Sequence, residues 1–209
     1  MISSRVVATL SLAFALLSGC VSSAPLRYYT LGAPTPADLH SRNKPSCAIA
    51  VGTITIPEMV DRPQIVLQTE PNRVVVLEQH RWAEPLKSEI SHAIVANLTR
   101  QLTDAWVIDA RQQASRNIDY RISIDVQRFD SQLNEAAVIE ALWVVRRAST
   151  GDELKGRTLA RETWKGNGYD ALAAAHGRAL QTMSGEIADA IRSLAAKDKG
   201  SSCFSANAP

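Results

Sequence analysis

Apolar and polar residues follow two different periods along this chain, and each change of period marks a predicted element. Residues 48–56 and 73–77 are nearly continuous apolar runs rich in β-branched residues, which predicts buried strands. Residues 64–68 form a shorter strand between them, and the turn at Pro71 and Asn72 joins this strand to 73–77 as a hairpin. The fold is therefore predicted to begin with a sheet.

A helical period begins after Pro85. This proline stands at the predicted start of the helix, where its missing N–H costs nothing and its fixed φ suits the first turn. Because residues four apart lie on one face of a helix, the spacing predicts an amphipathic helix that ends at Thr103 and Asp104. The apolar stripe consists of Leu86, Ile90, Ile94, Leu98 and Leu102.

The order of strands followed by a helix then occurs a second time. Residues 106–108 predict a short strand and 111–117 a polar loop. Residues 120–127 alternate apolar and polar side chains, as a half-buried strand does. Residues 136–147 are apolar enough for a central strand, and a turn leads to another strand at 154–164. These three strands are predicted to form an antiparallel meander.

A second long helix is predicted after the glycines near residue 168, with Asp170 as its N-cap. His176 lies on its apolar stripe, and no second metal ligand stands one turn away, which favours a core histidine over a metal ligand. The stripe consists of Leu172, His176, Leu180, Met183, Ile187, Ile191 and Leu194.

Each of the two predicted helices has one apolar face, and this face must be buried against a sheet. The predicted fold class is therefore α+β, a single-domain two-layer sandwich in which a mixed, mostly antiparallel sheet is covered by two long amphipathic helices.

The N-terminus carries the features of an exported lipoprotein. Residues 1–19 contain Arg5 and then an apolar segment too short to count as a membrane span, which predicts a signal peptide. Residues 17–20 (LSGC) are similar to a bacterial lipobox, which predicts cleavage before Cys20 and its acylation; the alternative is an ordinary signal peptide with a chance cysteine. Because Val21 is not aspartate, Gram-negative sorting rules imply the outer membrane.

The chain divides into four predicted parts. These are the signal peptide (1–19), a lipidated tether with a short N-terminal strand at 28–31 (20–46), the folded domain (47–196) and a flexible C-terminal tail (197–209). Removal of the signal peptide takes away one arginine and leaves a nearly neutral protein, since the whole chain has 23 Lys and Arg against 21 Asp and Glu. No basic stripe is visible, so we expect no nucleic acid as a partner.

Cys47 and Cys203 remain once Cys20 is lipidated. An even pair of cysteines in an oxidising compartment indicates a candidate disulfide, and two separate free thiols are the alternative. A disulfide here would join the start of the first core strand to the C-terminal tail. No histidine or further cysteine stands at ligand spacing, so we predict no metal site and no cofactor.

The block from Asp61 to Leu86 carries a resemblance to a known family. Its segments 61–66 (DRPQIV), 72–74 (NRV) and 81–86 (RWAEPL), together with Glu78, are similar to those of the ABC-type transport auxiliary lipoproteins. The resemblance implies a single compact domain, location in the envelope and a role in transport. Under it, the candidate partner-docking residues are Asp61, Arg62, Gln64, Arg81, Trp82 and Glu84.

A structural interpretation of the same residues stays open. Arg81 to Glu84 join a strand to a helix, and this corner could simply be packed, with Trp82 as its lid and Arg81 bonded to local carbonyls or to Glu84. Asp61 and Arg62 could pair with each other at the surface, at a gain of about 0–1 kcal/mol.

The resemblance implies a non-enzymatic outer-membrane lipoprotein that faces the periplasm. Its expected partners are a mammalian-cell-entry (MCE) domain periplasmic protein, inner-membrane transporter components and the membrane itself through the lipid anchor. The alternatives are a periplasmic lipid-binding carrier and a structural envelope lipoprotein, for which a homo-oligomer is possible. An enzyme is not favoured, because the four histidines are scattered and no catalytic motif is present.

Overall fold

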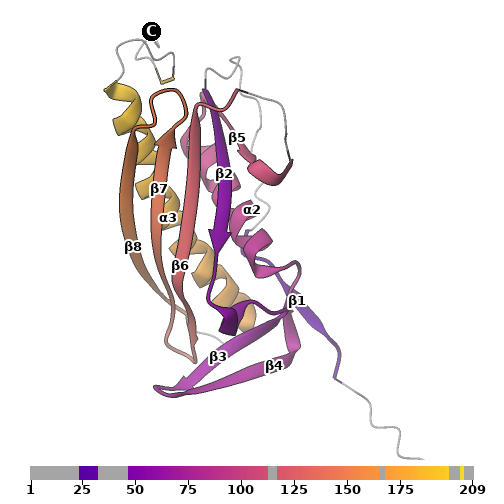
Figure 1. Cartoon of the computed structure of the whole chain (residues 1–209). Coiled ribbons are helices and arrows are strands. Elements are labelled where there is room, and N and C mark those ends of the chain that lie inside the picture. The colour runs from indigo at the N-terminus through magenta and orange to yellow at the C-terminus, as the bar shows by residue number, and fades with distance from the viewer. Residues whose placement is uncertain (1–23, 33–46, 113–116, 165–167, 198–202, 205–209) are drawn as a thin grey trace, which may run out of the picture.

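Eight strands and two long helices make up the part of the chain that the computed structural model describes, residues 24–32, 47–112, 117–164, 168–197 and 203–204 (Figure 1). The strands are β1 (Arg27–Tyr29), β2 (Cys47–Thr55), β3 (Gln64–Glu70), β4 (Arg73–Trp82), β5 (Ala105–Asp109), β6 (Tyr120–Gln132), β7 (Ala136–Arg147) and β8 (Glu153–Thr163). The helices are α2 (Leu86–Gln101) and α3 (Tyr169–Ala196), with 3₁₀ turns η1 (Glu58–Val60) and η2 (Ala110–Gln112). The predicted signal peptide and Cys20 lie outside the described residues.

The predicted meander of three antiparallel strands is confirmed. β6 pairs with β7 and β7 with β8 over eleven registered residue pairs each, from Tyr120↔Arg147 to Ala136↔Thr163. β6 alternates buried and exposed residues along most of its length, which explains why its pattern is readable in the sequence. The α+β class, the single domain and the mixed sheet are confirmed as well.

The sheet is mixed, and parallel pairing has a larger part in it than the expectation of a mostly antiparallel sheet suggests. Among the described strands, four of the seven pairings are parallel: β1 with β4, β2 with β5, β2 with β6 and β3 with β6. The reason is that β2 lies between β5 and β6, and not beside its sequence neighbour β3. A parallel pair needs a long crossover, and here α2 lies within the connection from β2 to β5.

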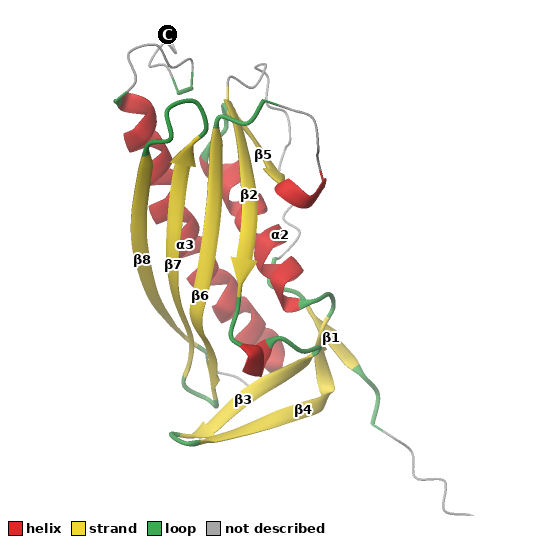
Figure 2. Ribbon diagram, viewed as in Figure 1, coloured by secondary structure: helices red, strands yellow, loops and turns green. Residues whose placement is uncertain are grey.

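Both helices lie on the same face of the sheet (Figure 2). Every residue of the predicted α3 stripe is buried, including Leu180 and Ile187, which have no exposed surface. Two end points differ from expectation. Pro85 is the N-cap and Leu86 the first helical residue of α2, while Gly168 is the N-cap of α3 and Asp170 lies in the first turn without a capping hydrogen bond.

The β3–β4 hairpin is longer than predicted. Its second strand continues past Leu77 to Trp82, so that Arg81 and Trp82 belong to the strand and not to a joint after it. Arg81 stands opposite Gln64, and the Trp82 backbone N–H donates to the Pro63 carbonyl over 2.8 Å. The hairpin crosses the lower end of the sheet in Figure 1, where β3 pairs with the last residues of β6.

The N-terminal segment is tied to the body of the domain at several points. β1 pairs with the end of β4, as an edge strand. The Ala83 N–H donates to the Tyr29 carbonyl over 2.8 Å, and the Leu31 N–H donates to the buried carboxylate of Glu89 over 3.0 Å. Gly177 permits this approach, because a Cβ there would lie 2.7 Å from the Leu31 carbonyl oxygen.

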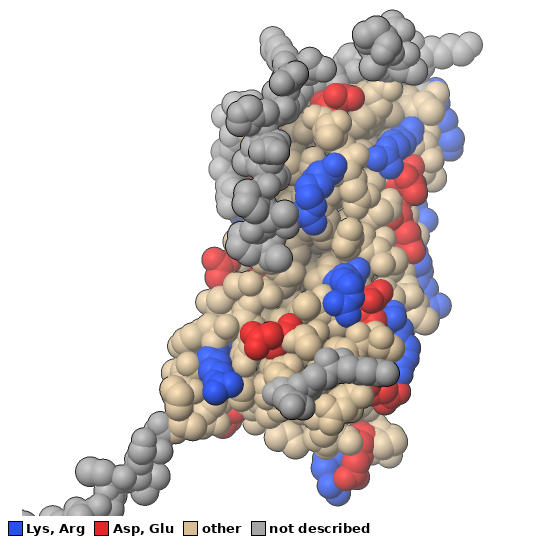
Figure 3. Space-filling view, turned by 180° about the vertical axis from the view of Figure 1, so that it is seen from behind, with Lys and Arg blue, Asp and Glu red and all other residues tan. Residues whose placement is uncertain are grey.

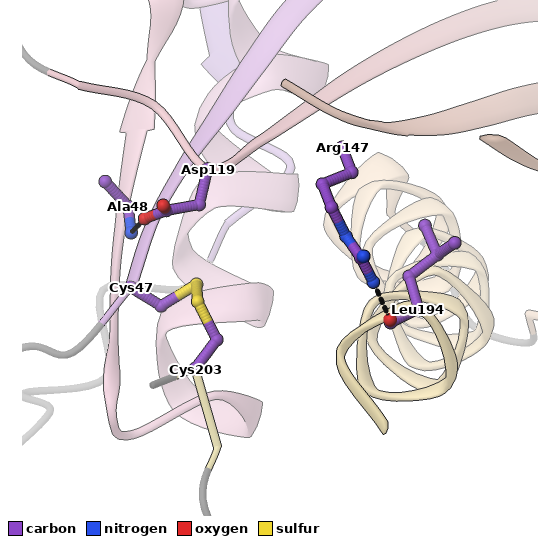
Figure 4. The surroundings of a disulfide bond; sticks show 6 residues. All are labelled: Cys47, Ala48, Asp119, Arg147, Leu194 and Cys203. Atoms are coloured by element: carbon purple, nitrogen blue, oxygen red, sulfur yellow. Dashed lines mark hydrogen bonds between the residues drawn. A yellow bond between two sulfur atoms is a disulfide. The ribbon is translucent and has the colours of Figure 1, made fainter. Parts of the chain in front are cut away.

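Cys47 and Cys203 form a disulfide in the structure, with their Cα atoms 5.0 Å apart (Figure 4). Both cysteines are buried, at 3% and 7% exposure. The bond joins the first residue of β2 to a position six residues beyond Lys197, the C-cap of α3. The rest of the predicted tail, apart from Lys197 and Phe204, lies outside the described residues.

Candidate docking surface

The two segments that carry the family resemblance lie side by side. The loop at Asp61–Gln64 lies against the end of β4, through the Trp82–Pro63 hydrogen bond and the Gln64↔Arg81 pairing. We call the exposed and half-exposed members of these segments the docking surface: Asp61, Arg62, Gln64, Arg81 and Glu84.

Asp61 pairs with Lys87, and not with Arg62 as one interpretation of the sequence suggested. The Lys87 ammonium lies 2.6 Å from the Asp61 carboxylate, and both side chains are about 40% exposed, 43% and 42%. This bridge joins the loop to the first turn of α2. Arg62, in contrast, is exposed and makes no side-chain hydrogen bond or ion pair among the described residues.

The other docking residues are bound locally but remain accessible. The Arg81 guanidinium donates through Nε to the Glu78 carbonyl over 3.2 Å, and the Gln64 amide donates to the Glu78 carboxylate over 3.1 Å. Glu84 lies 3.1 Å from Nδ1 of His92, a residue of the second turn of α2, and 51% of the Glu84 side chain is exposed. The surface therefore offers a cation, Arg62, beside two paired acids.

Trp82 does not belong to this surface, which corrects its assignment as a docking residue. Its indole is 4% exposed and packs edge to face against Phe129 and His176, with ring centroids 6.0 Å and 6.2 Å away. Adjacent strand residues point to opposite faces, so an accessible Arg81 sends Trp82 into the core. Trp82 is a core residue.

A cluster that the sequence did not reveal lies next to the start of α2. Asp109, at the end of β5, is 3% exposed and accepts hydrogen bonds from Ser91 Oγ at 2.8 Å and from the Arg111 guanidinium at 2.7 Å. The Arg111 hydrogen bonds hold the pKa of this carboxyl well below its usual range. Arg111 lay in a predicted polar loop, and no spacing pattern linked it to Asp109.

This cluster borders an open hollow of about 660 Å³ between the edge of the sheet and α2. Lys87 and Arg111 line it on one side, and Arg121, Arg146 and Glu153 line it from the outer face of β6, β7 and β8. Lys87 thus belongs both to the Asp61 bridge and to the rim of the hollow. The docking surface and the hollow are neighbours on one side of the molecule.

His176 is a core histidine, as its position on the α3 stripe predicted. It has no exposed surface, stacks on Phe129 at 4.0 Å between ring centroids, and has Nε2 2.9 Å from Ser131 Oγ. Ser131 is itself 3% exposed. The pair is sealed from solvent, so it offers no nucleophile to a substrate.

We expect this buried histidine to make the protein sensitive to mild acid. Burial lowers the pKa of His176 from 6.5 to about 3, whereas in the unfolded chain it takes up a proton near pH 6.5. The unfolded state therefore binds more protons below pH 6.5, and the free energy of unfolding falls toward pH 3 by about 1.4 kcal/mol per pH unit. Urea unfolding at several pH values between 7 and 4.5 measures this slope.

The variant His176→Gln is the control, because glutamine can keep a hydrogen bond to Ser131 and does not titrate in this pH range. Its unfolding free energy should depend less on pH than that of the wild type over the same range. The pKa of His80 is also lowered, chiefly by burial, and contributes a slope of the same sign in both proteins. Equal slopes for wild type and variant would contradict the assignment.

Among the residues that the structure describes, one group of side chains could hold a metal ion, and its members are already engaged. Ligand atoms of Cys47, Asp119 and Cys203 lie within 4.8 Å of one another. The two sulfurs are bonded to each other, and Asp119 accepts the Ala48 N–H over 2.8 Å (Figure 4). In this state the group has no thiolate to bind a metal with.

Basic and acidic side chains are interspersed on the face that carries the helices, outside its grey areas (Figure 3). None of the described helices is long and apolar enough to cross a membrane.

Comparison with known proteins places the chain in a family. Residues 29–188, well over half of the chain, match the ABC-type transport auxiliary lipoprotein component family, and the chain belongs to it. Among individual proteins, the chain is similar to the intermembrane transport lipoprotein PqiC of Escherichia coli K12, with 22% identity over 179 residues that cover 85% of this chain and 93% of that protein. The PqiC of Shigella flexneri gives the same values.

Two solved structures share the fold. One is the crystal structure of an uncharacterized protein, with a TM-score of 0.67 and 21% identity over 80% of this chain and 99% of that one. The other is a protein of Xanthomonas campestris, with a TM-score of 0.57 and 20% identity over 78% and 91% of the two chains. At these identities the likeness describes the fold alone.

Proposed function

We propose that this protein is a non-enzymatic lipoprotein of the outer membrane, facing the periplasm, that acts as an auxiliary component of an MCE/ABC-type intermembrane lipid transport system. The observation that carries the proposal is membership of the transport auxiliary family over residues 29–188. The similarity to PqiC, named for intermembrane transport, supports the same role. Cys20 would carry the acyl chains, and the signal peptide would end at residue 19.

The architecture suits a protein that docks and positions others. The space between sheet and helices is filled by side chains of the protein itself, among them Ile49, Ile90 and Ile122, which are at most 1% exposed. Such a filled core does not favour the alternative of a lipid carrier with an interior groove. The exposed charges at Arg62 and Glu84 are accessible to a partner.

The docking surface would bind the MCE-domain protein. Charged groups at a rim steer association and suppress wrong partners, so reversal of their sign is a sensitive test. We expect the double variant Arg62→Glu, Arg81→Glu to reduce capture of the MCE protein about tenfold in affinity purification from envelopes in mild detergent, with proteins and lipids identified by mass spectrometry.

The matched control reverses two exposed cations of β8 that do not line the hollow, Lys155→Glu and Arg157→Glu, and should capture the partner as the wild type does. Circular dichroism and a thermal melt verify that both double variants are folded. Undiminished capture by a folded Arg62→Glu, Arg81→Glu protein would refute the docking surface. Failure of the wild type to capture any MCE protein would count against the proposed function itself.

A further inference from the structure

The large apolar side chains that are exposed gather at one end of the molecule. The described residues expose eight of them, and six belong to β1, η1, the β3–β4 hairpin and the β6–β7 turn, or lie next to these elements. The remaining two, Leu142 and Leu159, lie on the outer face of the sheet. We call the six the apolar end: Leu26, Tyr28, Met59, Val74, Val75 and Leu133.

Backbone pairing brings Val74, Val75 and Leu133 together, and β1 joins β4 at the other end of that strand. Tyr28 stands opposite Arg81 of β4, and the Leu133 N–H donates to the Gln68 carbonyl of β3 over 2.9 Å. Gln68 in turn stands opposite Val74. Figure 1 shows β3, β4 and the β6–β7 turn together at its lower end, with β1 beside the base of the hairpin.

The tip of the β3–β4 hairpin lacks cover on both of its faces. Neighbouring residues of a strand point to opposite faces, yet Val74 and Val75 are both exposed, at 44% and 42%. The registered pairing of β3 with β6 is limited to Leu67 and Gln68, so only a short stretch of β3 joins the hairpin to β6. A gathering of exposed apolar side chains of this kind marks an interaction site.

The length of the N-terminal chain indicates what covers this end. Arg27, the first residue of β1, stands only seven positions after Cys20. Such a segment spans at most about 25 Å even when fully extended. An acyl chain on Cys20 would therefore keep β1 within that distance of the bilayer, and β1 belongs to the apolar end.

We propose that the apolar end is a second, shallow membrane contact, in which Val74, Val75 and Leu133 enter the interfacial region of the bilayer that holds the acyl anchor. The inference rests on the proposed function in one respect, the acylation of Cys20. Tyr28 suits this position, because its ring is apolar and its hydroxyl is polar, as at other membrane interfaces. The contact sets the orientation of the domain, with the Cys47–Cys203 end directed away from the bilayer.

Depth-dependent fluorescence quenching tests the contact in the lipidated full-length mature protein. Val75→Cys introduces a free thiol for an environment-sensitive fluorophore, since Cys47 and Cys203 are bonded and Cys20 is acylated. The protein is placed in vesicles of phosphatidylethanolamine and phosphatidylglycerol that contain doxyl-labelled lipid. Leu159→Cys, on the outer face of β8, is the matched control, and Leu133→Cys is a second probe should the hairpin variant fold poorly.

We expect doxyl lipid to quench the fluorophore at residues 75 and 133 at least fivefold more than at residue 159. Equal quenching at all three positions would overturn the proposal. So would a spectral shift at residue 75 that appears without vesicles and grows with protein concentration, because the hairpin would then contact a second copy of the chain.

Two further outcomes distinguish the membrane contact from the proposed transport function. Quenching at residues 75 and 133 without capture of an MCE protein would leave the membrane contact standing and remove the transport partner. A mature protein whose mass shows no acyl chains on Cys20 would overturn the membrane contact and the lipoprotein anchor together.

Discussion

Replacement of Cys203 with serine is expected to lower the free energy of unfolding by up to about 5 kcal/mol. The disulfide closes a loop of 156 residues, and in the chain-entropy description the stabilisation grows with the logarithm of loop length. An unfolded chain without this link gains conformational freedom that the native state does not share. Urea denaturation followed by far-ultraviolet circular dichroism measures the difference between wild type and variant.

The reductant dependence provides the control for this result. Wild type unfolded in dithiothreitol should approach the stability of the Cys203→Ser variant, and the variant itself should respond to the reductant no further. A wild-type denaturation curve that is the same with and without reductant would show that the bond contributes nothing in solution. Cys47 is the first residue of β2. Loss of the disulfide should therefore loosen the pairing of β2 with β5 before it loosens the rest of the sheet.

The parts of the fold that were predicted correctly depend on local patterns. The alternation in β6 and the stripe along α3 are periodic over ten residues or more, and each period states which side faces the core. A glycine in the sequence similarly predicted the turn of the β7–β8 hairpin, and Gly151 has a φ of +80° there. In such segments the local pattern of apolar and polar residues is sufficient to predict the observed element.

The parts that were missed depend on contacts between distant segments. The end of β4 is polar, from Glu78 to Arg81, and its strand conformation follows from pairing with β1 and with Gln64. The position of β2 between β5 and β6 depends on a crossover that no local period records. Neither the resemblance nor the period of the sequence contains these pairings.

The candidate site likewise combines features that the sequence predicted with features that depend on contacts between distant segments. The resemblance identified two short segments, and the structure brings them together at the Trp82–Pro63 hydrogen bond. It could not say which side chains point outward, so it included Trp82 among the docking residues. The Asp109–Arg111 cluster has no counterpart in the sequence interpretation, because its two ionic residues form an ordinary i, i+2 pair until β5 and α2 enclose the carboxylate.

Truncation of Trp82 to alanine is expected to lower the free energy of unfolding by about 3–5 kcal/mol, the usual cost of removing a large aromatic side chain from a core. The cavity would open against Phe129 and His176, which pack on the indole. Trp82→Phe keeps most of the apolar volume and should cost about 1 kcal/mol. Glu84→Ala changes an exposed side chain two residues away and should stay within about 0.5 kcal/mol of the wild type.

Urea unfolding of the three variants, together with the capture of the MCE protein, separates the two roles that the sequence allowed for this residue. A core tryptophan predicts a large loss of stability for Trp82→Ala, a small loss for Trp82→Phe, and unchanged capture by the folded Trp82→Phe protein. A docking tryptophan predicts the reverse: stability near that of the wild type and loss of the partner. The 4% exposure of the indole favours the first outcome, because a side chain that solvent barely touches cannot reach a partner unless β4 moves.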